Sequence, residues 1–251
     1  MNGIFTRLLS HLSQGVPSAC WVCRSWAREA VCADCLAQFA KPRLRCTTCA
    51  LPLVSASGVM RCGACLTLGS ALDSCHAAVD YAYPWDKLLQ RLKYSDAGDL
   101  TAQPALAGSL AQVMRHVATQ SDTLAKALTQ AQRCDAVIPI PLHPDRQQER
   151  GFNQAQQFAQ ALLPVAARIR TDLLLRVKNT AIQADLPRDT RIANMRHAFA
   201  AAPALAHQLK GCSVLLIDDV TTTTATLSAA ANALRQAGVT HVHALVFART
   251  A

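Results

Sequence analysis

The clearest signal in this chain is a stretch that reads Val214-Leu-Leu-Ile-Asp218-Asp219-Val-Thr-Thr222-Thr223-Thr224-Ala225-Thr226. Its apolar part predicts a buried strand over Ser213–Ile217, and the residues after the threonines, Ala225–Gln236, have helical spacing. Two adjacent acids and a run of hydroxyl groups therefore stand where a strand ends and a helix begins. Ligands of an open parallel sheet bind at that edge, and free N–H groups at a helix start favour phosphate. The stretch predicts a site for a sugar phosphate.

The two adjacent acids are the most informative part of this stretch. A helix cap without a ligand would need only a single Asp or Thr, so that simpler interpretation leaves the acidic pair and the run of threonines unexplained. Because side chains alternate along a strand, Asp218 and Asp219 should point to opposite sides. We expect one of them to face a ribose diol and the other to support the loop.

Strands and helices alternate through most of the chain. We expect strands at Ala77–Tyr83, Ala136–Ile140, Leu173–Leu175 and Val242–Ala248, and helices at Trp85–Tyr94, Thr101–Ala118 and Asn153–Leu163. This alternation predicts an α/β domain over residues 76–251, in which a mostly parallel sheet is flanked by helices.

The composition limits the classes of protein that need to be considered. The chain has 251 residues, 51% of them hydrophobic, and a formal net charge of +9. No apolar run reaches the roughly 18 residues of a membrane span, and residues 1–16 lack the pattern of a signal peptide. We therefore expect a cytoplasmic protein without membrane insertion. The basic excess favours polyanionic partners, although a plain basic surface would give the same balance.

Most of the 11 cysteines lie in Cys-x-x-Cys pairs within residues 1–75, namely Cys20/Cys23, Cys32/Cys35, Cys46/Cys49 and Cys62/Cys65. Such a pair offers two thiolates to one ion, so two pairs complete a closed tetrahedral site with a structural role. We expect a small module with two zinc ions. The simplest assignment gives the first two pairs to one ion and the last two to the other, but an interleaved arrangement would use the same residues. Iron–sulfur ligation, redox-active dithiols and disulfides are competing interpretations.

The acid–threonine stretch resembles the phosphoribosyl-pyrophosphate (PRPP) loop of type I phosphoribosyltransferases. That loop has two acids, two variable residues and then Thr-Thr-Gly-Ala-Thr, which align here with Asp218, Asp219 and Thr222–Thr226. The resemblance implies that the acids act on the ribose and its Mg²⁺, and that Thr222–Thr226 bind the 5′-phosphate. Thr224 replaces the glycine, which permits a positive φ or a close phosphate approach, and a β-branched residue there costs about 1–3 kcal/mol. We expect this departure to weaken the phosphate pocket.

Further motifs are similar to those of the ComF family, which is linked to DNA uptake in natural transformation. They are Leu92-Lys93-Tyr94, Pro139-Ile-Pro-Leu-His143-Pro-Asp-Arg146, Arg150-Gly-Phe-Asn-Gln154, Arg176-x-x-x-Thr180-x-x-Gln183-x-x-Leu186, Arg191-x-x-Asn194 and Ala198-Phe199. The four cysteine pairs fit the double zinc ribbon that commonly precedes this domain. The resemblance covers nearly the whole chain and implies a type I phosphoribosyltransferase-like fold.

Basic side chains near these motifs are candidates for binding pyrophosphate. Residues 139–146 read as a rigid Pro-rich turn, and residues 168–197 form a basic stretch that resembles the flexible lid of these enzymes. A solvated loop is the alternative for the second segment, and a structural hydrogen bond is the commoner role for a histidine such as His143. The candidates are His143, Arg146, Arg150, Lys178, Arg188 and Arg191.

Two functions are consistent with these residues. The first is a ComF-type role in DNA uptake, in which the loop binds PRPP or a related ligand and the partners are single-stranded DNA and a competence helicase. The second is an active phosphoribosyltransferase, which would transfer ribose 5-phosphate from PRPP to an acceptor and release pyrophosphate. The sequence identifies no acceptor pocket. Thr224 and the family resemblance favour the first function.

Overall fold

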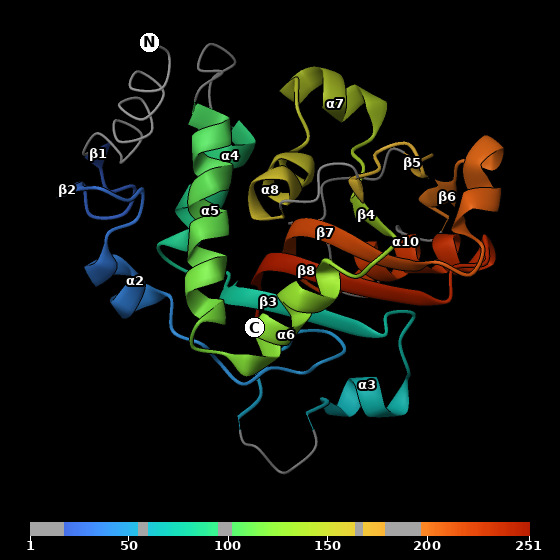
Figure 1. The fold of residues 1–251 in the computed structure, drawn as a ribbon, viewed down its shortest axis with the longest axis horizontal. Coiled ribbons are helices and arrows are strands. Elements are labelled where there is room, and N and C mark those ends of the chain that lie inside the picture. The colour runs from blue at the N-terminus through green and yellow to red at the C-terminus, as the bar shows by residue number, and fades with distance from the viewer. Residues whose placement is uncertain (1–17, 55–59, 95–101, 164–167, 179–196) are drawn as a thin grey trace, which may run out of the picture.

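A sheet of four parallel strands, in the order β3-β8-β7-β4, forms the centre of the fold (Figure 1). The structure, a computed structural model, describes residues 18–54, 60–94, 102–163, 168–178 and 197–251. The strands are β3 (Ser74–Asp80), β4 (Ala136–Pro139), β7 (Ser213–Thr221) and β8 (His241–Arg249). All three pairings are parallel, so the carboxyl ends of the strands meet at one edge. The predicted α/β fold with a parallel sheet flanked by helices is confirmed.

The two faces of the sheet bury two different apolar cores. Leu215 and Ile217 of β7 pack into the core that includes helices α4 (Trp85–Tyr94), α5 (Ala102–Ala118), α6 (Asp122–Ala131) and α8 (Gln154–Leu162). Val214 and Leu216 pack into the other core, on the side of α10 (Ala225–Gln236). The same alternation assigns Asp219 to the α4 face and Asp218 to the α10 face.

Helix α5 is the longest described helix, with 17 residues. Leu106, Leu110 and Met114 lie one turn apart along it and are buried, which fixes its apolar face against the sheet. Among the described residues, no helix combines the length and the apolar character that crossing a membrane requires.

A second, antiparallel pair of strands lies beside α10. It consists of β5 (Leu174–Arg176) and β6 (Phe199–Ala201), and β6 packs against α10. A 3-10 helix over Pro203–Leu209 leads from β6 to the main sheet. Because β6 has only three residues, it is too short to show the alternating pattern of a strand, and the sequence did not predict it.

Helix α6 was not predicted, and three expected elements differ in extent or type. Strand β7 runs through both acids to Thr221, because it stays paired with β8 as far as Thr221 and Arg249. Strand β3 begins at Ser74, before the expected start, for the same reason: Ser74 is already paired with His243 of β8. Residues after Leu142 form a helix, α7 (Pro144–Arg150), where a Pro-rich turn was expected. Proline is well tolerated in the first turn of a helix, where its missing N–H is not needed.

The first half of the cysteine-rich segment packs into the core on the α4 side of the sheet, whereas Ala50 of its second half packs into the core on the α10 side. The segment contains β1 (Ser18–Ala19), β2 (Trp26–Ala27), α2 (Ala33–Phe39) and α3 (Gly63–Thr67). Leu36 of α2 belongs to the core shared with α4 and α5, and the indole Nε1 of Trp85 donates to the carbonyl oxygen of Phe39 at 3.1 Å. The module and the sheet therefore share apolar surface, and their division at residue 75 stays a prediction.

Candidate functional site

A cleft of about 610 Å³ opens at the carboxyl edge of the main sheet. Each of the four strands supplies a lining residue at or just beyond its carboxyl end: Tyr81, Ile140, Asp218 and Thr250. Further polar residues come from α4, α7, α8 and β5, namely Gln90, Lys93, Arg146, Arg150, Gln154 and Arg176. The loop between β7 and α10 completes the lining, so acidic, basic and hydroxyl groups meet in one cleft.

Asp219 forms a buried ion pair with Lys93 of α4. Asp219 Oδ2 lies 2.8 Å from Lys93 Nζ, and Asp219 is only 3% exposed. Burial alone would raise the pKa of Asp219, but the adjacent ammonium group outweighs burial and holds the pKa below its usual value. Burial would likewise lower the pKa of Lys93, and the attraction of Asp219 raises it. Both members of the pair are therefore charged at neutral pH.

Asp218 has a different electrostatic environment from its neighbour. Its Oδ1 accepts a hydrogen bond of 2.9 Å from the backbone N–H of Asp219. Burial, together with the nearby negative charge of Asp219, raises the pKa of Asp218 well above its usual value. The adjacent acids thus divide into one carboxylate that is held ionised and one carboxyl group that retains its proton more readily.

The threonine loop enters α10 through a residue in the left-handed region. Thr224 has a φ of 60° and a ψ of 6°, a conformation that favours glycine. Its hydroxyl donates to the carbonyl oxygen of Thr223 at 2.6 Å and makes no capping bond to the helix. Of the two properties that the family glycine permits, a positive φ and a close phosphate approach, the structure shows the first at this position. Thr224 does not cap α10, although the N–H of Ala225 donates to Thr223 Oγ1 at 3.4 Å, and the other N–H groups of the first turn can meet an anion.

Three arginines give the cleft an excess of positive charge. Arg146 and Arg150 lie one turn apart on α7, so both reach the cleft from the same face of that helix. The guanidinium of Arg176 lies 5.6 Å from the centre of the Phe199 ring, and burial together with the charge of Arg146 lowers its pKa. With Lys93, four basic side chains meet two acids, and this balance suits a polyanionic ligand.

The predicted site residues separate into three groups. Those that line the cleft are Asp218, Asp219, Thr222, Thr223, Thr224, Ala225, Thr226, Arg146 and Arg150. His143 and Lys178 are not among its lining residues, and Arg188 and Arg191 lie outside the described residues. His143 begins α7, where its side chain accepts from the N–H of Asp145 and lies 3.2 Å from the Asp145 carboxylate. Gly151 ends α7 with a positive φ of 74°, and the side chain of Asn153 caps α8 through hydrogen bonds to its first turn.

Lys93 and Arg176 are cleft residues to which the sequence argument gave no role. Each stands in a motif that supports the family resemblance, and that resemblance was the available signal. The sequence did not indicate that these two residues lie near the acidic pair, because α4 and β5 are far from β7 along the chain. Only the folded sheet brings them to the edge that carries Asp218 and Asp219.

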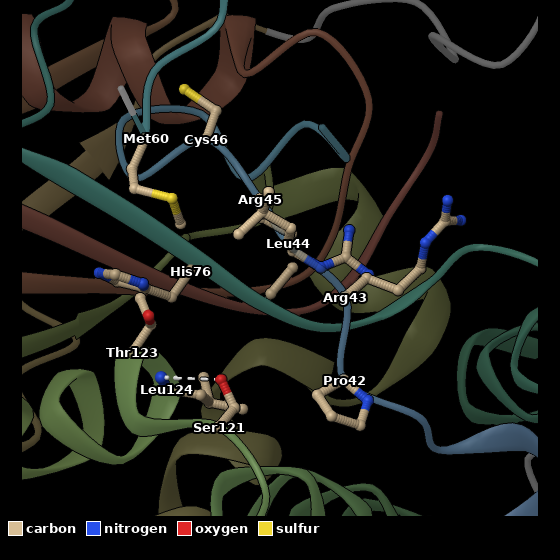
Figure 2. A pocket seen from close by; sticks show the side chains of 11 residues that line it. Pro42, Arg43, Leu44, Arg45, Cys46, Met60, His76, Ser121, Thr123 and Leu124 are labelled. Carbon is tan, nitrogen blue, oxygen red and sulfur yellow. Dashed lines mark hydrogen bonds between the residues drawn. The ribbon is translucent and has the colours of Figure 1, made fainter. Parts of the chain in front are cut away.

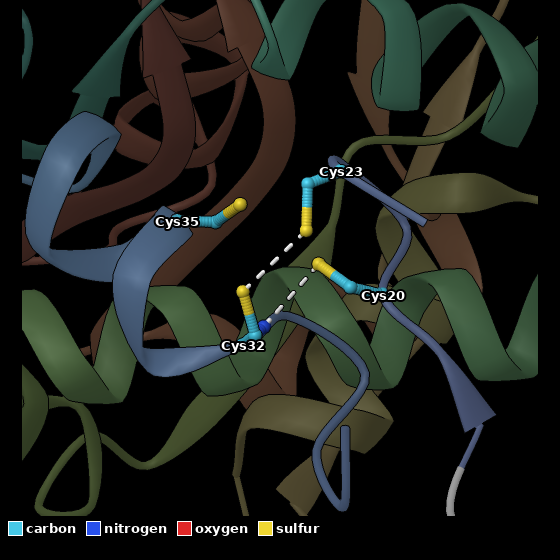
Figure 3. Close-up of side chains that lie close together, drawn as sticks. All are labelled: Cys20, Cys23, Cys32 and Cys35. Carbon is cyan, nitrogen blue, oxygen red and sulfur yellow. Dashed lines mark hydrogen bonds between the residues drawn. The ribbon is translucent and has the colours of Figure 1, made fainter. Parts of the chain in front are cut away.

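The paired cysteines form two separate groups of four. The sulfur atoms of Cys20, Cys23, Cys32 and Cys35 all lie within 4.8 Å of one another, and the same holds for Cys46, Cys49, Cys62 and Cys65. Figure 3 shows the four side chains of the first group pointing toward a common centre. The sequential assignment of the pairs is confirmed and the interleaved one is wrong. Every cysteine of the described segments is a free thiol, so disulfides do not hold the module together.

The spacing of the sulfur atoms fits a tetrahedral metal centre. Cys23 and Cys32 have their sulfurs 3.7 Å apart, and Cys49 and Cys62 have theirs 3.6 Å apart. In a tetrahedron with zinc–sulfur bonds of about 2.3 Å, the sulfurs lie about 3.8 Å apart. The N–H groups of Val22 and Cys32 point at Cys20 Sγ, and such bonds lower the pKa of that thiol although burial would raise it. Four thiolates close the site to water, which indicates a structural metal.

A smaller cavity of about 220 Å³ lies between the second cysteine group and the start of α6. Figure 2 shows Arg43, Arg45 and His76 along its wall. The two arginines are engaged by Asp80, with N–O distances of 2.5 Å and 2.7 Å. Arg43 and Arg45 thus form ion pairs that connect the cysteine module to the end of β3. Neither arginine of this cavity is therefore free to bind a ligand.

The parallel sheet, the polar cleft at its carboxyl edge and the two cysteine groups define an α/β protein with a cysteine-rich, zinc-ribbon-like module. The chain is 30% identical to competence protein F of Haemophilus influenzae over 228 residues, which are 89% of this chain and 92% of that protein. It is 28% identical to DNA utilization protein YhgH of Salmonella typhimurium (strain LT2) over 239 residues, which are 94% of this chain and 98% of that protein. The YhgH protein of Escherichia coli (strain K12) is 27% identical over 239 residues, which are again 94% of this chain and 98% of that protein. No protein-family model matches the chain. The chain belongs to the ComF family.

Proposed function

We propose that the cleft binds PRPP or a related phosphoribosyl ligand, and that the protein serves the uptake or use of DNA. The observation that carries the first part is the meeting of an acidic pair, a hydroxyl-rich helix start and three arginines in one cleft. The names of the relatives, competence protein F and DNA utilization protein YhgH, support the second part.

Each part of such a ligand has a chemically suitable partner in the cleft. The loop Thr222–Thr226 offers hydroxyl donors and the N–H groups at the start of α10, which suit a 5′-phosphate. Asp218 and Asp219 offer carboxylate oxygens that suit the ribose hydroxyls. Arg146 and Arg150 present two guanidinium groups from one helix face, and these suit a pyrophosphate.

Titration calorimetry with PRPP in a buffer that contains Mg²⁺ tests this assignment. We expect saturable binding to the wild-type protein and a loss of affinity of at least about tenfold in Asp218→Ala, since each charged hydrogen bond contributes about 1.5–3 kcal/mol. Asp172→Ala, which removes an exposed acid paired with Arg170, is the matched control and should bind normally. Failure of the wild-type protein to bind PRPP, ribose 5-phosphate and pyrophosphate would rule the proposal out.

For the cysteine groups, we propose two structural Zn²⁺ ions, one in each. The donor set consists of thiolates alone, and zinc binds such sets in closed tetrahedral sites that stabilise small folds. A module of this size cannot bury a large core of its own, so bound metal supplies stability that apolar burial does not.

Direct contact with single-stranded DNA has support from the surface of the module. Trp26 of β2 is 80% exposed, and Arg24 and Arg28, on either side of it along the chain, are exposed as well. An exposed indole between two arginines can stack on a base while the guanidinium groups meet phosphates. Fluorescence anisotropy with a labelled single-stranded oligonucleotide should show weaker binding by Trp26→Ala and a steep dependence on salt. Equal affinity of Trp26→Ala and wild type would remove the module from the DNA interface.

Phosphoribosyl transfer is the alternative activity for the same cleft. The three arginines favour it, because a cationic cleft stabilises the negative charge that develops on a departing pyrophosphate. Incubation with PRPP and candidate acceptors, followed by measurement of released pyrophosphate, distinguishes transfer from binding alone.

A further inference from the structure

The ammonium group of Lys93 lies beside the acidic pair, in the place that a divalent cation bound to Asp219 would occupy. Its Nζ lies 2.8 Å from Asp219 Oδ2, and the carboxylate is almost completely buried. Mg²⁺ binds carboxylate oxygens at about 2.0–2.1 Å and requires a near-octahedral set of ligands. An ion on the same oxygen would lie only a few ångströms from the ammonium group, where like charges repel strongly in a buried setting.

One oxygen of the neighbouring Asp218 is engaged as well. Asp218 Oδ1 already accepts the backbone N–H of Asp219. The residues present therefore do not fit a divalent cation ligated by Asp218 and Asp219.

Helix α4 holds Lys93 firmly in this place. Leu89 and Leu92, on the turn that leads to Lys93, are completely buried in the core beneath the sheet. The Lys93 side chain is 24% exposed, so it reaches the cleft with its charged end while its stem is packed. The charge of Lys93 also acts on Asp218, so a single ammonium group serves both acids.

We infer that Lys93 supplies the positive charge at the acidic pair, so that Asp218 and Asp219 hold no divalent cation of their own and are left to bind the hydroxyl groups of a sugar. The inference rests on the proposed function for the identity of that sugar, a phosphoribosyl group. The cleft accordingly recognises its ligand through protein cations, with Lys93 near the ribose and the arginines near the phosphates.

The first experiment uses Mn²⁺ alone as a paramagnetic probe of the zinc-loaded protein. We expect Asp219→Asn to leave Mn²⁺ binding of the otherwise wild-type protein unchanged, because no ion sits on the pair. Lys93→Met should gain a Mn²⁺ site at least about tenfold tighter than any in wild type, since the buried carboxylate of Asp219 then loses its cationic partner and has the carboxyl group of Asp218 beside it. Adding Asp219→Asn to Lys93→Met should abolish the new site. Lys87→Met, which removes an exposed lysine of the same helix, is the matched control and should gain no site.

The second experiment titrates PRPP in buffer freed of Mg²⁺ and again with Mg²⁺ present. The affinity of wild type for PRPP should differ by no more than about threefold between the two conditions. Without Mg²⁺, Lys93→Met should bind PRPP at least about tenfold more weakly than wild type does, and Mg²⁺ should restore part of that affinity. Mn²⁺ binding to wild type that Asp219→Asn removes would overturn the inference, and so would equal affinities of Lys93→Met and wild type for PRPP in both conditions.

The two experiments separate this inference from the proposed function. If wild type binds PRPP in neither condition, the proposed ligand is wrong, and the Mn²⁺ comparison still decides whether Lys93 excludes a cation. If Lys93→Met does not fold because Asp219 is left unpaired, the comparison of wild type with Asp219→Asn still decides whether the acidic pair holds a cation.

Discussion

The Nε of Arg249 donates a hydrogen bond to the carbonyl oxygen of Cys49 at 3.0 Å, and this contact joins the second cysteine group to the last strand of the sheet. Arg249 is only 6% exposed. Its own carbonyl oxygen accepts from the N–H of Tyr81, and the next residue, Thr250, donates to Thr221. Tyr81, Thr221 and Thr250 all line the cleft, so one arginine connects a cysteine knuckle to the proposed ligand site.

Replacement of Arg249 by methionine should therefore weaken both the fold and the second metal centre. The variant loses a charged hydrogen bond to Cys49 and the attraction between the guanidinium and the cysteine thiolates. We expect the free energy of unfolding in urea to fall by about 2–3 kcal/mol. Metal release to a chromogenic chelator should become faster for one of the two ions. Arg235→Met, which removes a similar bond from Nε to the carbonyl oxygen of Ala71, should destabilise the protein without faster metal release.

The metal content gives a second prediction, because the two groups share no ligand. Purified protein should contain about two zinc ions per chain, and Cys49→Ser should lower this number to about one. Cys212→Ser is the matched control, since Cys212 belongs to neither group. Elemental analysis of the three proteins checks the result. A folded wild-type protein without metal, or with iron in the same groups, would contradict the zinc assignment.

The local parts of this structure could be predicted from the sequence because short-range patterns determine them. Val214–Ile217 is apolar without interruption and is followed by the helical spacing of Ala225–Gln236, so β7 and α10 were predicted near their observed positions. The eight cysteines of the two groups were predicted for a similar reason, since a Cys-x-x-Cys turn offers two ligands to one ion, but the sequence left open which pairs share an ion. The left-handed conformation of Thr224 was one of two alternatives that the replaced glycine suggested, the other being a close approach of phosphate.

The parts that could not be predicted depend on contacts between distant segments. The pairing of Lys93 with Asp219 joins α4 to β7, and no local pattern indicates which lysine reaches an acid more than a hundred residues away. Helix α7 was interpreted as a turn because His143-Pro144 suits both a turn and a helix start, and the sequence alone does not decide between them. That error affected the site, since it hid the common helix face of Arg146 and Arg150.

Replacement of Thr224 by glycine should stabilise the protein. A non-glycine residue in the left-handed region costs about 1–3 kcal/mol, and glycine loses about 0.5–1 kcal/mol through the entropy of the unfolded chain. We therefore expect the free energy of unfolding to rise by about 1 kcal/mol, and PRPP to bind more tightly because the loop adopts its conformation without strain. Thr222→Gly is the control: the φ of Thr222 is not positive, so the same change should destabilise the fold. Equal effects of the two changes would mean that strain at Thr224 is negligible.

Removal of an arginine of α7 should weaken the binding of phosphates in the cleft. Arg146→Ala loses one guanidinium on the cleft side of the helix, and we expect at least about tenfold weaker binding of PRPP and of pyrophosphate. Ribose 5-phosphate should be affected less, because it lacks the pyrophosphate group. Arg168→Ala removes an arginine that instead donates to the carbonyl oxygen of Gln132, and it should leave all three affinities unchanged.

Acid should destabilise the protein through His76, which lies on β3 between the cysteine module and α6. Burial, and to a lesser degree the charge of His243, lowers the pKa of His76 from 6.5 to about 4. In the unfolded chain His76 takes up a proton below about pH 6.5, whereas in the folded protein it does so only near pH 4. The free energy of unfolding is therefore at its full value above pH 6.5 and falls as the pH drops from 6.5 to 4. Between pH 7 and pH 5 the loss from this residue should be about 2 kcal/mol. Urea unfolding at both pH values should show that the free energy of unfolding falls less in His76→Gln than in wild type. His207→Gln, which changes an exposed histidine, is the control and should lose as much as wild type does. An equal loss in wild type and His76→Gln would show that His76 is not the group that responds to acid.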